Sequence, residues 1–185
     1  MRQFFAVFLC VVSSLVGAAT PDKAADALAT AVQDIQADVV FMRHAIAPGY
    51  GDPEIFQIGD CSTQRNLDAQ GRAQAQQTGA ALRRSAAQFS EILSSEWCRC
   101  TETAALLDLG EWRTFAGLNS FFQGHADEAA TLLALRQRLQ SRSPGLTLMV
   151  THQVVISRIT GLTVGSGEMV AYNTRTQQAK RVRLS

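Results

Sequence analysis

One stretch, residues 38–49, constrains the fold more than any other part of the chain. It contains the apolar run 39–42, which includes two β-branched residues and is typical of a short strand buried on both faces. The run ends in Arg43 and His44, and a Pro/Gly turn follows at once. Ligands bind at the carboxyl ends of the strands in open α/β sheets. Arg43 and His44 are therefore candidate ligand-binding residues, although the pair also fits an ordinary surface Arg beside a hydrogen-bonded His.

Segments typical of strands alternate with segments typical of helices along the rest of the chain. Strands are predicted at 90–95 and 146–150, and helices at 67–84, 99–109 and 126–140. Such alternation implies βαβ units, whose parallel strands form a central sheet covered by helices on both faces. We therefore predict an α/β protein, a three-layer α/β/α sandwich with a mainly parallel central sheet. Further predicted elements are a helix beginning at Thr20-Pro21, a short strand at 112–115, and a final hairpin at 169–172 and 181–184.

The length and charge of the chain limit its possible functions. Its 185 residues suit one domain with a substantial core, because chains near about 150 residues bury roughly two-thirds of their unfolded surface. Its 17 basic and 16 acidic residues give a formal net charge of +1, so no global field recruits nucleic acid or anionic lipid. Any affinity for a charged ligand must therefore come from a local group of charges.

Residues 1–19 have the pattern of a secretory signal peptide. A basic start at 1–3 precedes an apolar stretch at 4–16, and small residues suited to cleavage follow. A membrane anchor is the alternative, but a membrane span needs roughly 20 apolar residues. We expect residues 20–185 to form a single exported domain, periplasmic or secreted, with no stable membrane insertion after cleavage.

Three cysteines, Cys61, Cys98 and Cys100, remain after the leader is removed. In an oxidising compartment an odd number implies one bridge and one free thiol, or one intermolecular bond. Cys98 and Cys100 are a poor pair, because residues two apart in an extended segment diverge along the chain. We expect Cys61 to pair with one of them, preferably Cys98. A metal site is the alternative, but the sequence has no second cysteine pair and no histidine at ligand spacing.

Three further segments, residues 66–75, 94–104 and 149–153, follow the first strand. Together with Arg43-His44 they resemble the histidine phosphatase superfamily in spacing and order. Its marks are Arg-His-Gly after the first strand, Leu-Thr-x-x-Gly-x-x-Gln-Ala, Ser-Ser-x-x-x-Arg-x-x-x-Thr-Ala, and a late second His. Here Ala45 replaces the usual Gly, Asp68 replaces Thr, and no Glu follows Ala45 as in the phosphoglycerate mutase branch. The resemblance implies a phosphoglycerate mutase-like fold in an exported small-phosphatase branch.

The same resemblance implies a covalent mechanism with neither metal nor cofactor. His44 is the expected nucleophile, which acts through one neutral ring nitrogen while a backbone carbonyl holds the other. Arg43 and Arg99 suit a phosphate dianion because a guanidinium makes forked hydrogen bonds, and Arg65 is a further candidate for phosphate binding. His152 is expected to act as a second donor, protonated in the presence of the dianion. Turnover then passes through phosphorylation of His44 and attack by water.

The acid that protonates the leaving group is marked less clearly. The superfamily often supplies an acid from a region that corresponds to residues 123–128, and Glu128 is our candidate, with Asp127 beside it. The other candidates are His125, Asp52 and Glu54. Alternatively, Asp127 and Glu128 are helix N-terminal acids that complement the helix dipole. If no acid exists, phosphoramidates or acyl phosphates become better substrates than alkyl phosphomonoesters.

The sequence thus predicts an exported, metal-independent phosphatase that acts on a small phosphorylated substrate. Its expected location suggests an envelope phosphoglycan as one such substrate. The alternative is a non-catalytic module on the same fold that binds phosphate or a phosphoglycan, which the missing acid and Ala45 motivate. A mutase is disfavoured because nothing in the sequence marks a lid that would retain a phosphorylated intermediate.

Overall fold

The structure, a computed structural model, describes residues 23–141 and 144–183. The strands are β1 (Val39–Arg43), β2 (Phe89–Ser94), β3 (Arg113–Thr114), β4 (Leu146–Thr151), β5 (Met169–Tyr172) and β6 (Ala179–Val182). The helices are α1 (Lys23–Ile35), α2 (Ala69–Arg84), α3 (Cys98–Leu107), α4 (Glu128–Gln140) and α5 (Gln153–Thr160). Short 3₁₀ turns are η1 (Cys61–Thr63), η2 (Ala116–Leu118) and η3 (Phe122–Gly124). The predicted signal peptide and Thr20-Pro21 lie outside the described residues.

The six strands form one sheet in the order β3-β2-β4-β1-β5-β6. β3, β2, β4 and β1 are parallel, whereas β5 is antiparallel to β1 and β6 to β5. β1 and β4 lie at the centre, and the side chains at 39–42 and 146–151 are all buried. The predicted mainly parallel sheet and its final hairpin are therefore confirmed.

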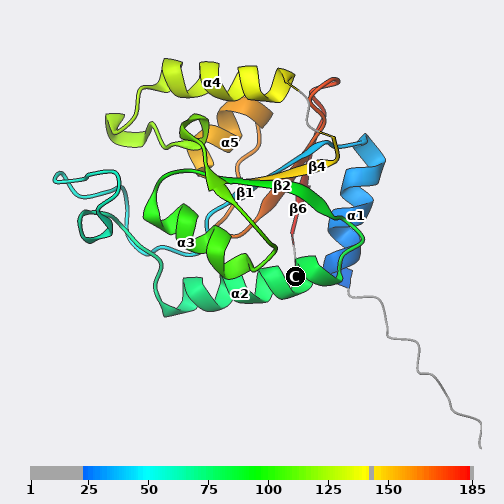
Figure 1. Cartoon of the computed structure of the whole chain (residues 1–185), viewed down its shortest axis with the longest axis horizontal. Coiled ribbons are helices and arrows are strands. Elements are labelled where there is room, and N and C mark those ends of the chain that lie inside the picture. The colour runs from blue at the N-terminus through cyan, green and yellow to red at the C-terminus, as the bar shows by residue number, and fades with distance from the viewer. Residues whose placement is uncertain (1–22, 142–143, 184–185) are drawn as a thin grey trace, which may run out of the picture.

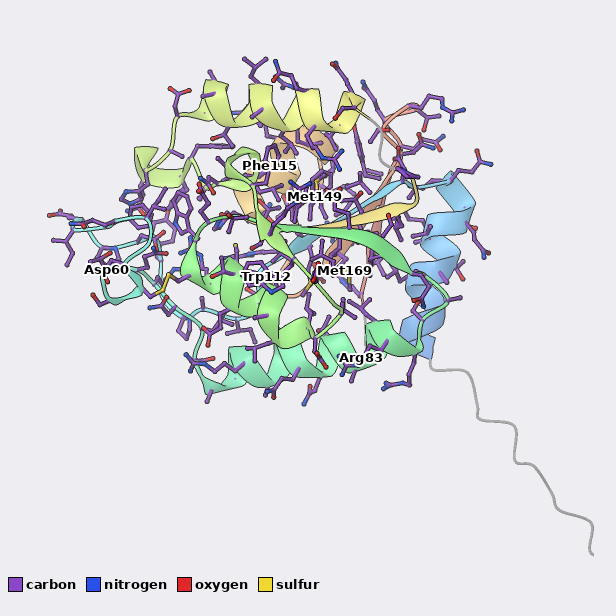
Figure 2. All side chains as sticks on the ribbon, viewed as in Figure 1. Asp60, Arg83, Trp112, Phe115, Met149 and Met169 are labelled. Atoms are coloured by element: carbon purple, nitrogen blue, oxygen red, sulfur yellow. A yellow bond between two sulfur atoms is a disulfide. The ribbon has the colours of Figure 1, made fainter. Side chains whose placement is uncertain are left out.

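Helices cover both faces of this sheet, so the molecule has three layers (Figure 1). α1, α2 and α3 lie on one face, and α4 and α5 lie on the other. Each face has its own apolar core, because successive residues of β1 point to opposite sides. Figure 2 shows Phe115 and Met149 on the face of α4, and Trp112 and Met169 on the opposite face. The predicted three-layer α/β/α sandwich is confirmed.

The carboxyl ends of β2, β4 and β1 meet at one edge, because these three neighbouring strands are parallel. The long connection from β1 to α2 extends beyond this edge (Figure 1). A disulfide between Cys61 and Cys98 ties this connection to the first residue of α3, and Figure 2 draws it as a yellow bond. Cys100 is a buried free thiol. The disulfide thus joins the pair of cysteines preferred from the sequence.

None of the helices within residues 23–141 and 144–183 is both long enough and apolar enough to cross a bilayer.

The disulfide should contribute strongly to stability. Its cysteines are 37 residues apart in sequence. In the chain-entropy model, closing a loop of that size raises the free energy of the unfolded chain by about 4 kcal/mol. We expect reduction with dithiothreitol to lower the free energy of unfolding, measured in urea, by about that amount. Cys61→Ser should show the same loss without reductant and no further change with it. An unchanged free energy after complete reduction of the wild type would contradict this role.

Candidate active site

The edge of the sheet brings together four side chains that are distant in sequence. Arg43 ends β1 and His44 follows it, Arg99 lies in the first turn of α3, and His152 connects β4 to α5. The ring centroids of His44 and His152 are 5.5 Å apart. Arg99 lies between the two rings, with Nε 3.2 Å from His44 Nε2 and Nη2 3.4 Å from His152 Nδ1. The four residues therefore form one site.

His44 is held as a neutral imidazole with a defined tautomer. Its Nδ1 lies 2.7 Å from the carbonyl oxygen of Ala45, which only accepts hydrogen bonds, so Nδ1 carries the proton. Its Nε2 accepts from Arg99 and is free of a proton. Burial, and next the charge of Arg99, lower the pKa of His44 to about 3. His44 thus has an unprotonated Nε2 at neutral pH, as a nucleophile requires.

His152 is also buried and neutral in this structure. Since Arg99 donates to its Nδ1, its Nε2 carries the proton and donates to Ser95 Oγ at 2.9 Å. Ser95 Oγ in turn donates to Asn119 Oδ1 at 3.1 Å. Burial, and next the charge of Arg99, hold the pKa of His152 well below its usual value. A bound anion is therefore needed before His152 takes up a proton.

A pocket of about 190 Å³ opens over these residues. Its lining combines three guanidinium groups and two imidazoles with apolar and aromatic side chains. The N-termini of α3 and α5 both lie at this edge, so their dipoles add positive potential. The lining residues are Arg43, His44, Gly49, Tyr50, Gly51, Arg65, Arg99, Ser120, Phe122, His152, Gln153 and Val154. The pocket is suited to an anion attached to a less polar group.

Arg43 and Arg65 reach this pocket from different segments. Arg43 Nη1 donates to the carbonyl of Val164 at 3.0 Å, and its buried Nε–H has no acceptor within the described part of the chain. Arg65 donates through Nε to the carbonyl of Gly51 at 2.8 Å and through Nη1 to that of Ala47. Carbonyl oxygens therefore fix both side chains without neutralising their charges.

Asp52 makes the shortest hydrogen bond to the Arg99 side chain. From the sequence, Asp52 was only one of the less favoured candidate acids. Its carboxylate binds Nη1 at 2.7 Å and Nη2 at 3.0 Å, and its side chain is 4% exposed. Burial alone would raise the pKa of Asp52, but the hydrogen bond and charge of Arg99 outweigh it and lower the pKa. Asp52 is therefore an anion paired with Arg99. Neither periodicity nor a motif marks this contact, because it joins a loop to a helix 47 residues away.

The other candidate acids lie away from the pocket. Glu128 is the first residue of α4 and forms an ion pair with Arg158. Asp127 is the N-cap of α4, and its carboxylate accepts from the N–H of Ala130 at 2.6 Å. His125 packs against Phe56 with ring centroids 4.5 Å apart, and Glu54 is exposed. Within the described residues, no carboxylate lines the pocket.

The remaining motif residues hold the backbone around the pocket. Thr103 Oγ1 accepts from the N–H of Ala45 at 3.0 Å. Gln74 accepts from the N–H of Ile46 and donates to the carbonyl of Ser166, both at 2.9 Å. Gly71 lies against the same segment, and a Cβ there would overlap the carbonyl oxygen of Ile46. The sequence marked these residues only as parts of motifs, and their role is to fix the chain that follows β1.

Asp68 and Ala45 differ from the residues usual at their motif positions. Neither difference removes the hydrogen bond from His44 Nδ1 to the carbonyl of residue 45. Asp68 stands where Thr is usual, but both side chains cap helices, and Asp68 Oδ1 accepts from the N–H of Gly71 at 2.7 Å. Ala45 stands where Gly is usual, and it is fully buried in a small cluster with Leu67 and Ala75. The carbonyl of residue 45 is present with any side chain, so the hydrogen bond to His44 Nδ1 is retained.

Cys100 lies beside His152 but is unsuited to chemistry. Its Sγ is 3.4 Å from His152 Nε2. Burial raises the pKa of its thiol to about 12, so it stays protonated and unreactive at neutral pH. In the described residues, no group of three or more His, Cys, Asp or Glu side chains is arranged to hold a metal ion.

Comparison of the sequence with protein families identifies a match over about half of the chain. A model of the histidine phosphatase superfamily (branch 1) matches residues 39–129, a segment that contains His44, Asp52 and Arg99. No curated protein matches the sequence significantly.

Solved structures with this fold include both mutases and phosphatases. Phosphoglycerate mutase from Thermus thermophilus is 20% identical over 80% of this chain and 99% of that chain, with a TM-score of 0.54. A mycobacterial glucosyl-3-phosphoglycerate phosphatase is 14% identical over 80% and 98%, with a TM-score of 0.54. The protein histidine phosphatase SixA, complexed with tungstate, is 15% identical over 78% and 94%, with a TM-score of 0.51. At these identities the likeness concerns the fold.

The buried neutral histidines should make stability depend on pH. The pKa of His44 is about 3 in the folded chain and roughly 6.5 in an unfolded one, so between these values the unfolded state binds more protons. The free energy of unfolding should then fall as the pH is lowered through this window, by about 1 kcal/mol per pH unit for each such histidine. Urea unfolding at pH 7 and pH 5.5 measures the fall, which should be about half as large in His44→Gln. An equal fall in both proteins would contradict the neutral state of His44.

Proposed function

We infer, from the match of residues 39–129 to the model of the histidine phosphatase superfamily, that the chain belongs to this superfamily, and we propose that it hydrolyses a phosphomonoester or a similar phosphoryl compound through a phosphohistidine on His44. The observation that carries the proposal is the state of His44. Its Nδ1 is held by the carbonyl of Ala45, its unprotonated Nε2 accepts from Arg99 Nε, and the residue lines a pocket together with three arginines. An imidazole nitrogen so placed can attack phosphorus, and the arginines can hold the equatorial oxygens.

The proposed reaction has two steps. In the first, His44 Nε2 forms a bond to phosphorus while the bond from phosphorus to the leaving group breaks, and its electron pair departs with the leaving atom. In the second, water attacks phosphorus, and the N–P bond breaks with its electron pair returning to His44 Nε2. One proton of the water leaves on the hydrogen phosphate product, and the other passes through solvent to the departed leaving group. Arg43 and Arg65, together with Arg99, balance the charge of the transferring group in both steps. His152 takes up a proton once the dianion is bound and becomes a donor to it.

The pocket favours substrates whose leaving group needs little help from an acid. Glu128, our candidate from the sequence, is paired with Arg158, and Asp52 is paired with Arg99. A carboxyl group whose oxygens contact a guanidinium is poorly placed to protonate a leaving group, and neither residue lines the pocket. We therefore propose that phosphoramidates, acyl phosphates or aryl phosphates are cleaved faster than alkyl phosphomonoesters.

We further propose that the enzyme acts outside the cytoplasm as a single domain of residues 20–185. The pattern of residues 1–19 supports export, and a disulfide between Cys61 and Cys98 is compatible with an oxidising compartment. A small phosphorylated envelope component, such as a phosphoglycan, is one substrate that this location would offer.

The first test is hydrolysis of p-nitrophenyl phosphate in the presence of EDTA. The wild type should turn over, because the proposed mechanism uses no metal, and His44→Ala should lose roughly 10⁴-fold or more in kcat because the nucleophile is gone. His125→Ala, a histidine outside the pocket, is the matched control and should retain activity. Undiminished hydrolysis by His44→Ala would refute the proposed mechanism.

A second test concerns phosphate binding by Arg65. Arg65→Gln removes one of three cations at the pocket and should raise KM and the Ki of inorganic phosphate about tenfold. Arg72→Gln is the control, because Arg72 lies on the surface and pairs with Glu102 at 2.6 Å. Equal KM values for the two variants would remove Arg65 from the binding site.

A binding module without turnover is the second candidate function. It is favoured by the absence of a carboxylate lining the pocket among the described residues. Calorimetry that shows phosphate binding, together with no hydrolysis of any aryl phosphate, acyl phosphate, phosphoramidate or phosphosugar, would support it. Turnover of any of these compounds that depends on His44 would exclude it.

A further inference from the structure

Every guanidinium N–H of Arg99 already has an acceptor in this structure. Nε donates to His44 Nε2 at 3.2 Å. Nη1 donates to Asp52 Oδ1 at 2.7 Å and to the carbonyl of Arg65 at 3.3 Å. Nη2 donates to Asp52 Oδ2 at 3.0 Å and to His152 Nδ1 at 3.4 Å. A guanidinium has five such donors, so a phosphate gains a hydrogen bond from Arg99 only if another acceptor gives one up.

Asp52 is the acceptor whose replacement matters most. A carboxylate and a phosphate both match the forked geometry of a guanidinium, and both are negatively charged. The two anions also repel one another inside a buried site. Asp52 therefore occupies the N–H donors of Arg99 that a phosphate would use.

Other hydrogen bonds hold Asp52 in the position from which it pairs with Arg99. Its Oδ2 accepts from Trp97 Nε1 at 3.1 Å, and its Oδ1 accepts from the N–H of Arg65 at 3.0 Å. Its own N–H donates to Gln123 Oε1 at 2.8 Å. The disulfide from Cys61 further ties this loop to the residue before Arg99. The carboxylate is thus preorganised, and little conformational entropy is lost when it pairs with Arg99 again.

We propose, on the basis of the phosphatase function above, that Asp52 competes with phosphate for Arg99 and thereby speeds release of the phosphate product. In this structure Arg99 pairs with Asp52 and caps the lone pair of His44 Nε2. Substrate draws donors of Arg99 away from Asp52 and His44, which frees Nε2 for attack. After hydrolysis Asp52 forms its ion pair with Arg99 again. Phosphate then has fewer hydrogen bonds to Arg99 and dissociates faster.

If Asp52 positions Arg99 instead of competing for it, the expected change in phosphate affinity has the opposite sign. If Asp52 only orients Arg99 toward a phosphate that binds beside it, removing the carboxylate leaves Arg99 poorly positioned and weakens phosphate binding. A competitor, in contrast, tightens binding when it is removed. The direction of the change in phosphate affinity separates the two roles, since loss of structure alone does not improve binding.

The experiment is calorimetric titration of the full-length protein with inorganic phosphate, together with steady-state hydrolysis of p-nitrophenyl phosphate. Asp52→Asn keeps the shape of the side chain and removes its charge. We expect its Kd for phosphate, and its Ki for phosphate as a product inhibitor, to fall about tenfold, since like charges placed together oppose binding. Its kcat should fall, because release of phosphate becomes slower, and its KM should fall as well.

Two further variants keep the test decisive. Glu54→Gln removes one negative charge from an exposed position on the same loop and should leave Kd unchanged. Gln123 is a surface residue whose side-chain oxygen accepts from the N–H of Asp52. Gln123→Ala removes this acceptor and leaves the negative charge of Asp52 in place. It should tighten phosphate binding about threefold, because a less restrained carboxylate competes less well, and it supplies the answer if Asp52→Asn does not fold.

An unchanged or higher Kd in both Asp52→Asn and Gln123→Ala would overturn the proposal, as would a tenfold fall in Glu54→Gln. These outcomes leave hydrolysis by the wild type untouched, so they do not refute the phosphatase. Conversely, tighter binding in Asp52→Asn by a protein that hydrolyses nothing would still establish competition for phosphate, while the proposed catalytic function would fail.

Discussion

The buried charge of Arg99 is the constraint that organises this molecule. Its side chain is 3% exposed, and a guanidinium in such a position is stable only when it is paired and fully hydrogen-bonded. The acceptors come from four separate parts of the chain: the end of β1, the loop after it, the segment before α2 at Arg65, and the turn after β4. The fold must therefore bring these segments together before the charge can be buried.

The long connection between β1 and α2 takes its shape from this requirement. It delivers Asp52 to Arg99, and further contacts anchor it along the first turn of α3. Gln64 Oε1 accepts from the N–H of Cys98 at 2.9 Å, which satisfies one of the donors left open at a helix N-terminus. The disulfide at Cys98 and the stacking of Phe56 on Trp97, with centroids 4.8 Å apart, complete the attachment. The connection thereby becomes a fixed wall of the pocket.

The sequence was informative where local chemistry determines structure, and less so where it does not. The apolar runs at β1 and β4 predicted central strands because few other environments accept them, and parallel pairing then required His44 and His152 to end at one edge. The role of Asp52 could not be predicted, since its partner is 47 residues away and an acid in a loop is usually solvated. Glu128 was preferred because the superfamily often supplies an acid from the corresponding region, and only the tertiary structure pairs it with Arg158.

The same burial that constrains Arg99 also keeps His44 neutral among three arginines, which is the state that the proposed nucleophile needs. Water exclusion and positive charge both disfavour an imidazolium, so the pKa of His44 is lowered to about 3 and that of His152 is lowered as well. The full positive charges that would attract a dianion are thus those of the arginines and not of the imidazoles. Binding of a dianion reverses the local field, which favours protonation of His152 at the stage where a donor becomes useful.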